Sequence, residues 1–249
     1  MPGFETVIYE KKDGVAYITL NRPKALNVYN IKMRDELNQV FGAVREDDEV
    51  RVGIIQGAGD RAFCAGADLS EFLTAPPPVF ARQARFDRDI WGVFLSVPQP
   101  IIAALHGYVL GSGVEIALFS DIRIAADNTQ FGVPEMGLGI IPAAGATRTL
   151  PAVVGRGYAL EMLLSGRYIK APEALHMGLV NRVVPRADLL TAAEKLAGEI
   201  KSVPATTTRL IKEAIRRGLD MGLPEGLELE SRLAARALAA VSPWSESQR

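Results

Sequence analysis

Two glutamates, Glu115 and Glu135, are the residues of this sequence best placed for acid–base chemistry. Glu115 is in the first turn of an expected helix over residues 114–119, where a carboxylate meets the positive end of the helix dipole. Glu135 follows 20 positions later, after a proline. Apolar runs at 101–105 and 122–126 predict buried strands whose ends bring both carboxyls to one place. The alternative is a helix-capping glutamate and an unrelated glutamate in an exposed loop, and the motif alone leaves both open.

Two turns built of small residues accompany the first glutamate. Gly111 and Gly113 flank Ser112 just before it, and residues 62–69 read A-F-C-A-G-A-D-L. Small residues let bare backbone amides face a cavity, so both turns are candidates for ligand contact. Asp68 is expected to cap a short helix that follows it. Either segment, taken alone, also fits an ordinary tight turn.

The remaining reactive side chains favour structural roles. Cys64 and His106 suggest a thiol nucleophile, but no third group is evident to orient them, so we expect a buried cysteine and a strand-end histidine. Two histidines and one cysteine offer no metal-ligand spacing. The Gly111–Gly113 turn lacks the third glycine of a dinucleotide-binding loop. We therefore expect no metal and no cofactor.

Composition indicates a packed globular protein. The chain has 249 residues, 48% of them apolar and 23% charged, with net charge −1. That charge disfavours nucleic acid and anionic membrane surfaces as partners. The single cysteine excludes an internal disulfide framework and fits a reducing compartment. With neither a secretory signal nor an apolar membrane-spanning run in view, we expect a cytoplasmic protein.

The order of elements predicts an α/β fold. Strands are expected at 7–10 and 15–20 around an Asp13-Gly14 turn, at 52–56 and at 180–184. Helices are expected at 30–46 behind an Asn30 cap, and at 81–97, 158–164 and 171–177, with a proline-rich loop at 75–78. This alternation implies parallel pairing with right-handed crossovers. Amphipathic helices follow at 189–200, 205–217 and 223–240. We divide the chain into a core, 1–187, and a helical region, 188–249, that is too small to stand alone.

Four segments, in this order, resemble the crotonase, or enoyl-CoA hydratase/isomerase, superfamily. They are L-N-R-P-K-A-L-N at 20–27, A-F-C-A-G-A-D-L at 62–69, and the stretches 101–121 and 131–147. The resemblance runs from about residue 7 to about residue 240. It implies the ClpP/crotonase-like fold, a ββα spiral, followed by a C-terminal helical trimerisation region. It also implies a homotrimer or a dimer of trimers.

The same resemblance implies an acyl thioester of coenzyme A as substrate. Its thioester oxygen is expected between the backbone N–H groups of Ala67 and Ser112, with Glu115 and Glu135 as the acid/base pair. Coenzyme A is then part of the substrate, and no separate cofactor is expected. Further substrate-binding positions are implied at Lys24, Ala25, Leu26, Ala65, Asp68, Leu69, Gly111, Pro134 and Ala143.

The presence of both Glu115 and Glu135 favours an enoyl-CoA hydratase within this family. Such an enzyme adds water across the 2,3 double bond to give 3-hydroxyacyl-CoA. An enoyl-CoA isomerase or another acyl-CoA lyase of the same fold is an alternative, as is a non-catalytic acyl-CoA-binding or scaffold subunit. The chain departs from the family pattern in having Ser112 for a glycine, extra methyl groups at Ala143 and Ala146, and a short C-terminus. Acyl-chain preference and pathway stay open.

Overall fold

The structure is a computed structural model that describes residues 3–72 and 89–241. Its larger sheet has the strand order β1-β2-β3-β5-β7-β10. The antiparallel β1–β2 hairpin turns through Asp13 and Gly14, both with positive φ, and every other pair is parallel, as predicted. The strands are β1 (Val7–Lys12), β2 (Val15–Leu20), β3 (Val52–Gly57), β5 (Ile101–Leu105), β7 (Ile122–Ala126) and β10 (Arg182–Val184).

A second sheet of short strands has the order β4-β6-β8-β9. Its members are β4 (Ala62–Cys64), β6 (Tyr108–Leu110), β8 (Gln130–Gly132) and β9 (Ile169–Lys170). The chain passes from β3 to β4, from β5 to β6 and from β7 to β8, so each of three successive segments gives one strand to each sheet. Helices separate these segments along the chain. The fold is therefore the strand–strand–helix spiral that the resemblance implied.

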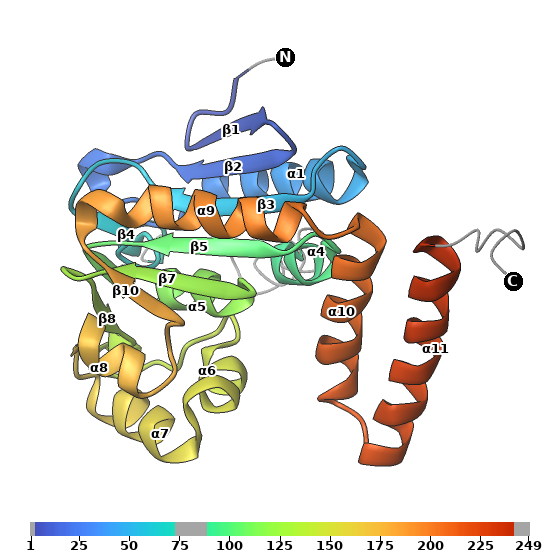
Figure 1. Cartoon of the computed structure of the whole chain (residues 1–249). Coiled ribbons are helices and arrows are strands. Elements are labelled where there is room, and N and C mark those ends of the chain that lie inside the picture. Colours follow the sequence, from blue (N-terminus) through green and yellow to red (C-terminus); the bar gives the residue numbers. More distant parts are fainter. Residues whose placement is uncertain (1–2, 73–88, 242–249) are drawn as a thin grey trace, which may run out of the picture.

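The central strands β3, β5 and β7 of the larger sheet are buried on both faces, as parallel strands usually are. Ile55, Ala103 and Leu105 face the main core, where α1 (Ile31–Glu46) also packs. Ile54, Ile102, Ala104 and Ile124 point the other way, toward Leu189, Ala193 and Ala197 of α9 (Leu189–Lys201). Figure 1 shows α9 lying across this outer face.

Most of the predicted helices are confirmed. The Asn30 side chain accepts a hydrogen bond from the Met33 amide at 2.9 Å and caps α1. Helices α7 (Arg156–Ser165) and α8 (Ala171–His176) lie where the pattern placed them. Only α4 (Ile90–Ser96) is described of the helix expected at 81–97, and the expected loop at 75–78 lies outside the described residues. Strand β10 starts later than predicted because the amides of Leu179 and Val180 donate to Ala174 O at the end of α8.

The last two helices form a hairpin beside the body (Figure 1). Helices α10 (Ala205–Gly218) and α11 (Leu223–Val241) share a small cluster of their own, Leu210, Leu229 and Leu233. Lys212 ties α10 to the body by an ion pair with Asp121 at 2.6 Å. Helix α9, by contrast, shares a core with the larger sheet. The division of the chain into a core, 1–187, and a helical region, 188–249, stays a prediction. No helix within the described ranges has the length and apolar character to cross a membrane.

Candidate active site

One cavity of about 1110 Å3 collects most of the predicted site residues. It lies among the loop after η1 (Pro23–Ala25), the turn before α2 (Leu69–Phe72), the start of α5 (Ser112–Phe119), and η2 (Pro134–Leu138) with the loop that follows. Lys24 and Ala25 do not line it, and their role in binding stays a prediction. The predicted residues that line it are Leu26, Ala65, Ala67, Asp68, Leu69, Gly111, Ser112, Glu115, Pro134, Glu135 and Ala143.

The two amides expected to hold the thioester oxygen are both available. Ser112 is the first residue of α5, so its N–H has no acceptor within the helix. Tyr29 pairs with the residues on either side of Ala67: its N–H donates to Gly66 O, and its carbonyl accepts from the Asp68 amide. In such a parallel bridge the Ala67 N–H points away from Tyr29. Neither amide has an acceptor within 3–72 or 89–241.

Two glycines allow these segments to approach closely. A Cβ on Gly113 would lie 2.2 Å from Cys64 O, so only glycine lets α5 pack against the end of β4. Gly111 has φ 48° and ψ −117°, a conformation that favours glycine, and a Cβ there would lie 2.6 Å from Oε1 of Glu135. Ser112, between them, lines the cavity. Its replacement of a glycine is therefore compatible with the site.

Glu115 is buried and held by backbone donors. Only 2% of the residue is exposed. Its Oε1 accepts hydrogen bonds from the amides of Ala144, at 2.9 Å, and Ala146, at 3.2 Å. Both amides belong to the loop and first turn of α6 (Ala146–Val154). Donors of this kind stabilise the ionised carboxylate and fix its orientation in the cavity.

Glu135 has a contrasting environment. Its Oε2 is buried without a hydrogen-bond partner in the described part of the chain, and its Oε1 lies against Gly111. Loss of solvent raises the pKa of the Glu135 carboxyl above its usual range. The cavity therefore holds one carboxyl that accepts hydrogen bonds from two main-chain amides and one whose pKa is raised by burial.

Asp68 supports the site without being free to react. Its Oδ2 pairs with Arg22 Nη1 at 2.9 Å, while Oδ1 accepts from the Ser70 hydroxyl and amide, which confirms the predicted cap of α2. The Ser70 hydroxyl and the Arg22 guanidinium lower the pKa of Asp68. Arg22 also donates to Val28 O at 2.8 Å, joining the two loops that carry Leu26 and Ala67. Arg22 lies in the L-N-R-P motif, and this role was not predicted from the sequence.

An aromatic wall of this cavity was not predicted from the sequence. Tyr29, Trp91 and Phe119 line the cavity and stack in series, with ring centroids 5.9 Å and 5.0 Å apart. Of the two aromatic residues of α4, Phe94 is buried and Trp91 is partly exposed at the cavity. Helical spacing in the sequence does not distinguish these two positions.

The expected structural roles of Cys64 and His106 fit their surroundings. Both are buried. Burial raises the pKa of the Cys64 thiol to about 12 and lowers the pKa of His106 to about 4, so neither carries the charge of a thiolate–imidazolium pair. The described residues contain no group of three or more His, Cys, Asp or Glu side chains able to hold a metal ion.

Comparison with known proteins establishes the family. Residues 10–242 match the family described as enoyl-CoA hydratase/isomerase, and the chain belongs to that family. It is 40% identical to a short-chain-enoyl-CoA hydratase of Clostridium acetobutylicum, over 90% of this chain and 86% of the relative. It is 38% identical to a crotonyl-CoA hydratase of Syntrophomonas wolfei, over 92% and 88% of the two chains. A crystal structure of enoyl-CoA hydratase from Bacillus anthracis superimposes with a TM-score of 0.88 at 37% identity, covering 93% of this chain and 90% of that one.

Proposed function

We propose that this protein is an enoyl-CoA hydratase, which adds water across the 2,3 double bond of an enoyl-CoA thioester to give 3-hydroxyacyl-CoA. The observation that carries the proposal is the pair of unlike carboxyls, Glu115 and Glu135, in one cavity beside the start of α5. Family membership supports an acyl-CoA thioester as the substrate, and the names of the relatives support hydration as the reaction.

The backbone would stabilise the charge that develops during the reaction. As water attacks C3, negative charge grows on the thioester oxygen. The N–H groups of Ala67 and Ser112 receive this oxygen, and the positive end of α5 adds to the stabilisation. Amides fixed by secondary structure need no reorganisation when the charge appears, so they lower the barrier without a cofactor.

The two glutamates would divide the proton transfers. Glu115, whose carboxyl accepts hydrogen bonds from the amides of Ala144 and Ala146, acts as the base and removes one proton from water while the hydroxide oxygen bonds to C3. Glu135, favoured in its protonated form, donates its proton to C2. The product has gained one hydroxyl and one hydrogen. Proton exchange from Glu115 back to Glu135 closes the cycle.

A spectrophotometric assay with crotonyl-CoA tests the proposal, because hydration removes the enoyl absorbance. We expect turnover by the native protein and ~100-fold or greater losses in Glu115→Gln and in Glu135→Gln. Glu228→Gln, exposed on α11, is the matched control and should keep full activity. Turnover of a 3-enoyl-CoA without hydration would instead identify an isomerase. Tight binding of the ester without turnover would identify a non-catalytic subunit.

We further propose that the chain works as a homotrimer or a dimer of trimers. Ile211 and Ile215 of α10 and Leu219, just after that helix, are 53%, 58% and 82% exposed, and Leu223 and Leu227 of α11 are also exposed. Several large apolar side chains exposed on one helical hairpin support contact with another subunit. Size-exclusion chromatography with light scattering measures the mass of the assembly, which should be three or six times the mass of one chain. The single cysteine and a coenzyme A substrate also support a cytoplasmic location.

A further inference from the structure

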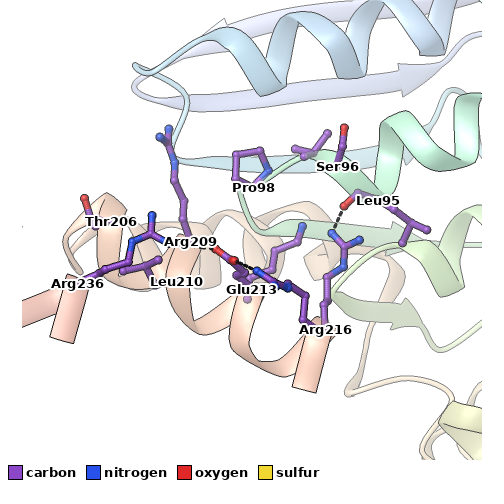
Figure 2. A pocket seen from close by; sticks show the side chains of 12 residues that line it. Leu95, Ser96, Pro98, Thr206, Arg209, Leu210, Glu213, Arg216 and Arg236 are labelled. Atoms are coloured by element: carbon purple, nitrogen blue, oxygen red, sulfur yellow. Dashed lines mark hydrogen bonds and ion pairs between the residues drawn. The ribbon is translucent and has the colours of Figure 1, made fainter. Parts of the chain in front are cut away.

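A second cavity, which we call the basic cavity, lies between the end of α4 and the α10–α11 hairpin (Figure 2). Its volume is about 510 Å3, within the range of small-molecule sites. None of its lining residues lines the catalytic cavity. They are Leu95, Ser96, Val97, Pro98, Thr206, Arg209, Leu210, Lys212, Glu213, Arg216, Arg217 and Arg236.

Positive charge exceeds negative charge around the basic cavity. Five of its lining side chains are cationic and one, Glu213, is a carboxylate. Asp48 and Asp121, outside the lining, pair with Arg209 and Lys212. Glu213 pairs with both Arg217 and Arg236, at 2.5 Å and 3.9 Å. Arg216 donates to the carbonyl of Leu95. Five cations thus share three carboxylates within the described residues, which leaves two positive charges uncompensated.

The donors of this cavity also have unused capacity. Nη2 of Arg209 is buried and has no hydrogen-bond partner in the described part of the chain. Figure 2 shows Arg209, Glu213 and Arg216 on α10 facing the segment that carries Ser96 and Pro98. Planar guanidinium groups match the paired oxygens of phosphate, and two excess charges match a phosphate dianion. Buried Val97 and Leu210 supply an apolar wall for the organic part of a ligand.

We propose that the basic cavity binds a small phosphate ester carrying two negative charges. The phosphate belongs either to a free metabolite or to coenzyme A itself, whose phosphates have the same chemistry. The site is separate from the thioester-binding cavity, so its occupancy does not depend on the hydratase reaction.

Calorimetric titration of the full-length protein with inorganic pyrophosphate tests this proposal. We expect saturable binding that weakens ~10-fold or more when Arg217 and Arg236 are both changed to Gln, because both lose charge-assisted donors. Arg232→Gln is the matched control. Arg232 is also exposed on α11, pairs with Glu228 and does not line the cavity, so its loss should leave affinity unchanged.

Glu213→Gln gives the opposite sign. It removes the one carboxylate that lines the cavity and releases two arginines, so pyrophosphate should bind several-fold tighter. Absence of saturable binding at millimolar pyrophosphate overturns the proposal, as does equal affinity in the native protein and the Arg217→Gln/Arg236→Gln variant with matching melting temperatures. Repeating the titration with saturating coenzyme A separates the sources. Unchanged binding identifies a free ester, whereas lost binding identifies the phosphates of coenzyme A.

Discussion

Replacing Ser112 with proline would test the backbone donor at a helix position that accepts proline. Ser112 is the first residue of α5, where proline is tolerated because the missing N–H has no acceptor in the helix. The change deletes one N–H that is expected to contact the thioester oxygen. Loss of one such donor typically costs ~10²–10³ in kcat, or about 3–4 kcal/mol of transition-state stabilisation.

The measurement is steady-state hydration of crotonyl-CoA together with thermal unfolding. Ser112→Ala keeps the amide and is the matched control, so its kcat should stay within a few-fold of the native value. Ser112→Pro should lose kcat at an unchanged melting temperature. If Ser112→Pro folds normally and keeps the native kcat, the Ser112 amide does not stabilise the transition state and the proposed oxyanion site is wrong.

Three further outcomes follow from the site and its anchors. Glu135→Gln should raise the melting temperature at neutral pH, and this gain should vanish in acid. The pKa of the Glu135 carboxyl is raised in the folded protein, so its ionisation costs stability above the pKa of the unfolded chain and costs nothing below it. Gly111→Ala should lower kcat ~100-fold or more, measured with crotonyl-CoA, because the new methyl would meet Oε1 of Glu135. Lys212→Met should cost roughly 2 kcal/mol in denaturant unfolding, less in an Asp121→Asn background, because it leaves Asp121 without its cation.

Long periodic segments of this chain were predictable from the sequence. Helix α1 has a side-chain cap at Asn30 and a regular apolar face, and β1–β2 has a two-residue turn at Asp13-Gly14, so local signals agree with the fold. The three-residue strands β4, β6 and β8 offer no period to detect. They form because the neighbouring turns of the spiral place them in register, and only the resemblance implied them.

The extra methyl groups at Ala143 and Ala146 show a similar limit. Ala143 does line the catalytic cavity, but Ala146 is fully buried in the main core, beside residues such as Leu150. Ala143 lies in the loop before α6, whereas Ala146 is the first residue of that helix, so helical spacing does not relate the directions of their side chains. Sequence spacing alone cannot decide which one meets substrate before the start of that helix is known.

The different surroundings of the two glutamates could not be predicted from the sequence, for a related reason. Glu115 and Glu135 are the same residue type, and their spacing says only that two carboxyls can meet. Glu115 accepts hydrogen bonds from the amides of Ala144 and Ala146, 29 and 31 positions away, whereas Oε2 of Glu135 has no hydrogen-bond partner in the described part of the chain. A variant that lost the Ala144 amide, such as Ala144→Pro, would weaken this asymmetry with both carboxyls intact. Which main-chain amides reach the Glu115 carboxyl thus depends on the loop that precedes α6.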